Sequence, residues 1–281
     1  MILVTGAGGN VGGALLGHLR GAGAAVRAAY RDPRRTERVI GAGGQAVTLD
    51  LADPDTLGPA LDGIDTVFLL APTGPAQTTL ELTMVEAARA AGARVVKLSV
   101  WRADEQLTPI ARLHRPVEEA LFASGLPWTV LRPNFYLQNF LRQSSVREAG
   151  QFTLPLVTAP ISFIDVDDVA RVAARVLTTD GHEGRVYDLT GPRALTYAEA
   201  AEQFSEVLGR PVRYVGPADD EARAMMLGRG MPRFQADALI EVARAYRDGG
   251  ADTVTSTVAD LTGRAPLGFA DFVRQNRHVF E

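Results

Sequence analysis

Short apolar runs alternate with amphipathic segments through the first half of the chain. The apolar runs cover residues 1–4, 24–30, 46–49, 66–70, 94–99 and 128–131, and helix-compatible segments cover 53–61, 77–91 and 108–124. The runs are nearly continuous in apolar residues, as strands covered on both faces require, whereas the segments repeat with the period of one helix face. This alternation predicts a doubly wound α/β fold, with a parallel sheet and helices on both of its faces.

A glycine-rich turn follows the first apolar run directly, with the sequence Thr5-Gly6-Ala7-Gly8-Gly9-Asn10-Val11-Gly12. Gly6 permits a tight turn, Gly9 lets the backbone approach phosphates, and Gly12 lets the next helix pack close to the strand. The free N–H groups and positive dipole at the start of that helix suit a pyrophosphate. The spacing departs from a strict G-x-G-x-x-G. The prediction of a dinucleotide site therefore depends on the strand before the turn and the apolar-periodic segment after it. The alternative is a glycine turn that binds no ligand.

The end of the second apolar run indicates which dinucleotide is bound. A site for NAD usually has an acidic residue there, but this chain reads Tyr30-Arg31-Asp32-Pro33-Arg34-Arg35. The guanidinium groups of Arg31 and Arg35 suit a 2′-phosphate, which predicts NADPH as the cofactor; the alternative is a solvated basic turn. Further cofactor contacts are expected where the third and fourth runs end, at Asp50, Leu51, Leu70, Ala71 and Pro72.

The pattern loosens after residue 133. Helices are predicted over 134–147, 165–178 and 196–208, strands over 161–164, 185–189 and 211–215, and a mostly helical region from 218 onward. Thr196 and Glu199 form a capping box at the start of one of these helices. We expect a dinucleotide-binding domain over 1–133, with returning segments around 161–190, and a smaller, mostly helical, discontinuous substrate lobe over 134–281.

Composition excludes several classes of function. The chain has 281 residues, 46% of them hydrophobic and 22% charged, with a net charge of −4, so nothing indicates a nucleic-acid partner. It has no cysteine, which excludes disulfides and thiolate chemistry. No apolar run approaches a membrane span, and a strand that starts at Met1 leaves no room for a signal peptide. We expect a cytoplasmic protein that binds a small-molecule substrate, and a homodimer is compatible with the sequence.

Several motifs together resemble the NmrA-like group of atypical short-chain dehydrogenase/reductases. They are the glycine turn over 5–12, the basic turn after residue 30, and the segments 124–134, 164–170, 261–264 and 271–273. The resemblance spans nearly the whole chain. It implies an NADPH-dependent reductase of quinones, imines, enones or similar unsaturated molecules, or a nucleotide-binding sensor that acts through protein contacts and catalyses nothing.

The usual proton donor of short-chain reductases is missing. That donor is a tyrosine with a lysine four residues later, and alignment through Glu118 places Ile110 at the tyrosine position and His114 at the lysine position. No Tyr-x-x-x-Lys occurs in the chain. His114 is therefore a candidate proton donor or partner of the nicotinamide ribose; the alternative is a helix histidine satisfied by packing. Ser99 is expected to orient the substrate, and Tyr136 is a second candidate acid.

The substrate site is expected to follow the strand over 128–131. Its predicted wall consists of Trp101, Phe135, Asn139 and Phe163, with Asn134 contacting the cofactor, Phe140 behind the wall, and Met225, Met226, Met231 and Phe234 closing it. Aromatic, methionine and amide side chains suit a flat, largely apolar molecule; each could equally be core. Asp165, Asp167 and Asp168 lie in the first turn of a predicted helix, where carboxylates favour the dipole, so no metal site is predicted.

Overall fold

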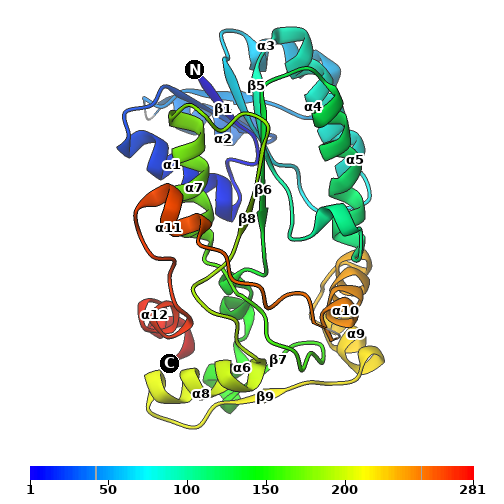
Figure 1. Cartoon of the computed structure of the whole chain (residues 1–281), viewed down its shortest axis with the longest axis vertical. Coiled ribbons are helices and arrows are strands. Elements are labelled where there is room, and N and C mark those ends of the chain that lie inside the picture. The colour runs from blue at the N-terminus through cyan, green and yellow to red at the C-terminus, as the bar shows by residue number, and fades with distance from the viewer. Residues whose placement is uncertain (42, 248) are drawn as a thin grey trace. The chain divides into compact units, whose positions relative to one another are not determined.

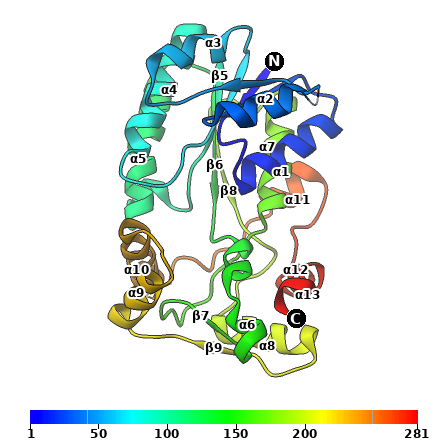
Figure 2. The same cartoon turned by 180° about the vertical axis from the view of Figure 1, so that it is seen from behind.

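The computed structural model of the chain describes residues 1–41, 43–247 and 249–281. It divides into two compact units, which we call unit 1 (residues 1–105, 111–132 and 169–187) and unit 2 (residues 106–110, 133–168 and 188–281). Residues 169–187 belong to unit 1, and residues 133–168 and 188–281 belong to unit 2. Figures 1 and 2 show the chain from two opposite sides.

A seven-stranded sheet forms the centre of the α/β fold. Its order is β3 (Ala46–Thr48), β2 (Val26–Tyr30), β1 (Ile2–Val4), β4 (Thr66–Leu69), β5 (Arg94–Leu98), β6 (Trp128–Pro133) and β8 (Arg185–Leu189). Each pair from β3 to β6 is parallel. The bonds from Gly184 N–H to the Trp128 carbonyl and from Asn134 N–H to the Leu189 carbonyl continue the same sense at β8. The predicted doubly wound fold is confirmed.

Helices cover both faces of this sheet (Figures 1 and 2). One face carries α1 (Asn10–Gly21), α2 (Pro33–Gly41) and α7 (Val166–Thr178), and the other carries α3 (Leu57–Leu61), α4 (Gln77–Ala91) and α5 (Pro109–Ala123). Fully buried side chains such as Val67, Met84 and Leu121 fill the space between the sheet and the second group. α4 has the bounds that the periodicity predicts, and it ends at Gly92 in the left-handed conformation that suits a helix C-terminus.

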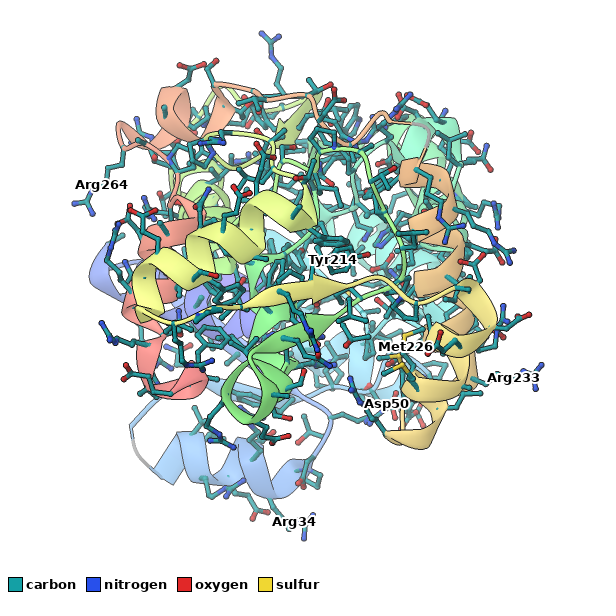
Figure 3. The ribbon with its side chains drawn as sticks, turned by 90° about the horizontal axis from the view of Figure 1, so that it is seen from below. Arg34, Asp50, Tyr214, Met226, Arg233 and Arg264 are labelled. Carbon is teal, nitrogen blue, oxygen red and sulfur yellow. The ribbon has the colours of Figure 1, made fainter. Side chains whose placement is uncertain are left out.

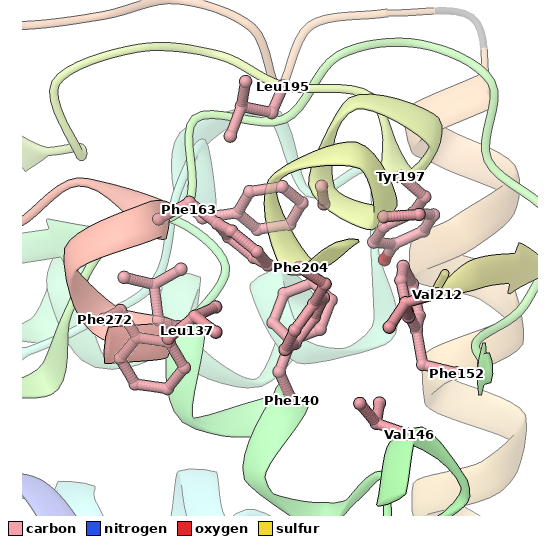
Figure 4. Close-up of a cluster of buried hydrophobic side chains, with 14 of the residues drawn as sticks. Leu137, Phe140, Val146, Phe152, Phe163, Leu195, Tyr197, Phe204, Val212 and Phe272 are labelled. Carbon is pink, nitrogen blue, oxygen red and sulfur yellow. The ribbon is translucent and has the colours of Figure 1, made fainter. Parts of the chain in front are cut away.

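Unit 2 combines short helices with one pair of strands. Its elements are α6 (Ser145–Ala149), β7 (Gln151–Thr153), α8 (Tyr197–Leu208), β9 (Arg213–Val215), α9 (Asp219–Gly228), α10 (Arg233–Arg247), α11 (Thr257–Thr262), α12 (Phe269–Gln275) and α13 (Arg277–Phe280). β7 and β9 pair in parallel. Thr196 and Glu199 form the predicted capping box at the start of α8. Phe140, Phe152 and Phe204 lie fully buried in an aromatic core (Figure 4).

Three segments differ from the sequence prediction. Residues 134–147 form a 3-10 helix over Leu137–Arg142 followed by α6 instead of one helix, and Gln143 between the two accepts from the Thr153 N–H. Residues 161–164 make only two isolated bridges, Tyr136 to Ile164 and Ile161 to Leu195. α2 was predicted as a turn, because its sequence is mostly polar and only Thr36 is buried along it, so few apolar residues mark a buried helix face.

Candidate functional site

The glycine turn of unit 1 leaves no room for side chains. Gly6 has a φ of +62°, and its carbonyl accepts from the Gly9 N–H at 2.9 Å. A Cβ atom added to Gly12 would lie 2.2 Å from that same carbonyl oxygen, far inside contact distance. Thr5 Oγ1 donates to the Phe68 and Leu70 carbonyls at 3.0 and 2.9 Å and accepts from the Leu70 N–H, which fixes the turn against the end of β4.

The start of α1 remains open for an anion. Gly9 is its N-cap residue, no side chain caps it, and its first turn, with Asn10 and Val11, contains no acidic residue. The backbone N–H groups of this turn and the helix dipole therefore favour a phosphate, as the glycine spacing predicts. These residues fit a dinucleotide, because Gly12 lets α1 pack directly against the backbone of Gly6 and Ala7, and no side chain caps the N-terminus that this packing places at the turn.

The arginines of the basic turn after β2 differ in their partners. Arg34 pairs with Asp32 at 3.1 Å, so the carboxylate next to Arg31 already has a cationic partner. Arg35 lies over the Tyr30 ring at 4.9 Å, and its guanidinium is so close to the glycine turn that a Cβ added to Gly8 would lie 2.6 Å from Nη1. Arg31 is exposed and has no ion pair or hydrogen bond from its side chain within the described ranges. Arg31 and Arg35 are thus the cations available to a 2′-phosphate.

The residues at the ends of β3 and β4 shape loops. Asp50 Oδ1 accepts from the Ala52 N–H at 3.0 Å, and the Asp50 N–H donates to Thr56 Oγ1 at 3.2 Å, so this carboxylate already organises its own turn. Leu51 and Leu70 are half-buried, and Pro72 is exposed. The Ala71 N–H donates to Glu81 at 3.1 Å, which connects the end of β4 to a buried polar cluster.

Lys97, the only lysine of the chain, is completely buried in β5. Its ammonium donates to Glu81 Oε1 at 2.9 Å and to the Leu98 carbonyl, and it lies 2.9 Å from Nδ1 of His114. Burial raises the pKa of Glu81 and lowers the pKa of Lys97, and the attraction between the two charges opposes both shifts. The three N–H groups of the ammonium thus meet three acceptors, which is the condition for burying such a charge.

His114 lies inside this cluster. Burial and the adjacent Lys97 ammonium hold the pKa of His114 well below its usual range, so the ring is neutral at pH 7. Because Lys97 donates to Nδ1, the ring proton is on Nε2, which faces the Gln77 amide at 3.0 Å. Gln77 Oε1 is buried and has no partner, and an amide turned with this oxygen toward Nε2 satisfies both groups.

Ser99 belongs to a second buried cluster at the end of β5. Its hydroxyl donates to Glu118 Oε1 at 2.6 Å. Arg132 binds the same carboxylate through Nε at 2.9 Å and Nη2 at 2.6 Å, and it also pairs with Asp104 at 2.9 Å. Both candidate catalytic groups of unit 1, Ser99 and His114, therefore have buried polar partners.

Unit 2 contains a cavity of about 390 Å³. Of the residues predicted to form the substrate wall, Phe135 and Asn139 line this cavity, together with Met225, Met226 and Met231. Phe163 lies instead in the aromatic core, 3% exposed and stacked on Tyr197, and Phe234 does not line the cavity. Trp101 belongs to unit 1, where it is buried.

Two further predicted site residues, Asn134 and Tyr136, belong to unit 2. The Asn134 amide donates to Ser162 Oγ and to the Ala251 carbonyl, and its oxygen accepts from Tyr246 at 3.2 Å. Tyr136 is largely buried, and this burial raises the pKa of its phenol, which weakens it as an acid.

The aspartates near the start of α7 stabilise loops. Asp165 Oδ1 accepts from the Asp167 N–H at 2.7 Å, and Asp168 accepts from the Leu267 N–H at 2.7 Å. Within the described ranges, no cluster of histidine and carboxylate side chains could hold a metal ion. No described helix is long and apolar enough to cross a membrane.

Sequence reasoning missed the partners of His114 and Ser99. Lys97 is a charged residue inside the apolar run Val95-Val96-Lys97-Leu98, which is a signal of a buried ion pair that could have been noticed. Glu81 gives a weaker signal, since it lies on the apolar face of α4. The pairing itself joins separate elements and is visible only in the fold.

Comparison with known proteins gives consistent results. The chain is 35% identical to an NAD(P)H azoreductase of Xenophilus azovorans and 39% identical to a Streptomyces griseus (4-alkanoyl-5-oxo-2,5-dihydrofuran-3-yl)methyl phosphate reductase, covering 100% of this chain and 99% of each relative. The crystal structure of the Escherichia coli NADPH-dependent quinone oxidoreductase QOR2 complexed with NADPH superimposes with a TM-score of 0.90 at 28% identity, over 100% of both chains. The model of the NmrA-like family matches residues 1–263. The chain therefore belongs to the NmrA-like family.

Proposed function

We propose that this protein is an NADPH-dependent reductase of small unsaturated molecules. The observation that supports this most directly is the open glycine cradle of unit 1 with Arg35 against it: the cradle suits a pyrophosphate, and the arginine suits the 2′-phosphate that distinguishes NADPH. The relatives named for azo compounds, quinones and an unsaturated lactone phosphate support a hydride acceptor of this general kind.

In this proposal the two units divide the work. Thr5, Gly9 and the first turn of α1 would hold the pyrophosphate, and Arg31 and Arg35 would hold the 2′-phosphate. When bound, the nicotinamide supplies the hydride, and the cavity of unit 2 with Phe135 and Asn139 would hold the acceptor. Quinones, azo compounds and enones suit a protein without a strongly acidic tyrosine, because the reduced product takes its proton from a weak acid or from water.

His114 is the proposed proton-bearing group of unit 1. It is neutral, with its proton on Nε2, so it is not an imidazolium acid, and it would donate to a ligand only in place of the Gln77 amide. Lys97 and Glu81 would fix this tautomer. Ser99 would hold Glu118 and Arg132 in place at the end of β5 and β6.

The experiment is NADPH oxidation, followed at 340 nm, with a panel of quinones, azo dyes and enones, together with calorimetric titration of NADPH. We expect micromolar binding and acceptor-dependent oxidation. The matched variants are Arg35→Gln, which should weaken NADPH, and Arg34→Gln, which removes an arginine already paired with Asp32. Absence of binding would refute the proposal.

A sensor that binds NADPH without turnover is the second candidate. The engagement of both Ser99 and His114 by buried partners favours it, because neither side chain is left with an unused polar group. Micromolar NADPH binding with no oxidation across the whole panel would select the sensor over the reductase.

A further inference from the structure

The cavity of unit 2 is electrostatically one-sided. Its only charged lining residues are Arg142 and Arg229, and no aspartate or glutamate among the described residues lines it. The chain as a whole carries a net charge of −4, so this positive cavity is not a consequence of overall composition. A local excess of arginine facing a cavity favours an anionic ligand.

Arg142 and Arg229 also differ from the arginines around them. Arg223 and Arg233 pair with Asp237 at 2.7 and 3.5 Å, and Arg244 pairs with Asp219 at 2.7 Å. In the described ranges, the side chains of Arg142 and Arg229 have no ion pair or hydrogen bond, and both residues are exposed at the cavity. They remain available to a ligand.

The rest of the cavity suits a flat or extended apolar body. Phe135, Tyr197 and Tyr246 supply aromatic surface. Met225 and Met226, both half-buried, supply flexible thioethers that adapt to an aromatic or alkyl group. Figure 3 labels Met226, which lies on α9, and Arg233, which projects away from α10. The volume of about 390 Å³ is in the range of cavities that hold small organic ligands.

We infer that this cavity takes amphiphilic anions: small molecules with an aromatic or alkyl body and one terminal phosphate, sulfonate or carboxylate, which Arg142 and Arg229 hold. The inference rests on the proposed function, because it names the substrate class of the same reductase. A relative that is 39% identical over the whole chain is named for a substrate of this class, an alkanoyl lactone with a methyl phosphate group.

The test compares two dyes that differ in one group, 4-hydroxyazobenzene and its 4′-sulfonate. Their dissociation constants are measured by equilibrium dialysis against the full chain with saturating NADP⁺, which keeps the sulfonate away from Arg31 and Arg35. We expect the sulfonate to bind about tenfold more tightly or better, as two charge-assisted contacts allow. Equal binding of the two dyes would overturn the inference.

Single variants test whether Arg142 and Arg229 bind the anionic group. Arg142→Gln and Arg229→Gln should each weaken the sulfonate about three- to tenfold and leave the neutral dye within about twofold, while Arg229→Lys should retain most of the affinity. Arg233→Gln is the matched control, because it removes an equal charge from an exposed arginine that does not line the cavity. A loss in Arg233→Gln as large as in the other two, or an equal loss for both dyes, would refute the assignment.

Failure of this inference is distinguishable from failure of the proposed function. Both dyes are therefore also tested for NADPH oxidation. Preferential binding of the sulfonate supports the anion site even if neither dye nor any other acceptor of the panel is reduced, a result that refutes the reductase. Oxidation of the neutral dye with no preference for the sulfonate supports the reductase and refutes the anion site.

Discussion

The buried pair of Lys97 and Glu81 gives a quantitative prediction for Lys97→Met. Methionine is similar in length and removes the charge, which leaves Glu81 completely buried beside a neutral His114. Removal of one partner from a buried ion pair costs about 3–5 kcal/mol, because the remaining charge is desolvated without compensation. We therefore expect the variant to lose about 3–5 kcal/mol of unfolding free energy at pH 8.

The size of that loss should depend on pH. Burial already raises the pKa of Glu81, and without Lys97 that pKa rises further. A carboxyl with a raised pKa in the folded state contributes stability that is present below its unfolded pKa and lost as the pH rises, with a slope of up to about 1.4 kcal/mol per unit. His114, with Nδ1 4.0 Å from Glu81, can also take up a proton at low pH. The variant should therefore approach the native protein as the pH falls from 8 to 5.

The assay is urea unfolding followed by circular dichroism at pH 5, 6, 7 and 8. The double variant Lys97→Met/Glu81→Gln is the control, because the amide keeps an acceptor for the Ala71 N–H without a charge. It should recover about 1–3 kcal/mol of the loss at pH 8. The reasoning is refuted if the loss of unfolding free energy in Lys97→Met is the same at every pH, or if the double variant at pH 8 loses as much as Lys97→Met or more.

Four further predictions concern other parts of the chain. The lowered pKa of His114 predicts stability that is present above its unfolded pKa and lost as the pH falls below about 6.5, by up to about 1.4 kcal/mol per unit; urea unfolding of His114→Gln should show a smaller slope over this range, and an unchanged slope would contradict the prediction. Arg35→Gln should weaken NADPH about tenfold or more in calorimetric titration and leave NADH nearly unchanged, and equal losses for both would contradict the 2′-phosphate contact. Gly12→Ala should abolish dinucleotide binding in the same titration, because its Cβ would lie 2.2 Å from a carbonyl oxygen. Phe140→Ala should destabilise the aromatic core by about 3–5 kcal/mol in thermal or urea unfolding, since this ring is fully buried, and a loss below about 1 kcal/mol would refute its place in the core.

The short-range pattern predicted the elements whose signals lie within one segment. α4 and β8 have the predicted bounds, and the capping box at Thr196 begins α8 as expected, because periodicity and capping are local properties. The segment 134–147 was predicted less well. There the helix is interrupted before Gln143, whose side chain accepts from the backbone of β7, a contact that no local pattern encodes.

The sequence by itself determined the doubly wound fold, the glycine cradle and the basic turn. The fold follows from the alternation of apolar runs and amphipathic segments, and each turn follows from a short run of consecutive residues whose backbone constraints are local. The tertiary structure alone decided which side chains have partners. Lys97, Glu81 and His114 come from β5, α4 and α5, and only the packing of two helices on one strand places a lysine between a carboxylate and an imidazole. The same holds for Arg142 and Arg229: no carboxylate among the residues that the structure describes lines the cavity beside them, which depends on how distant segments pack.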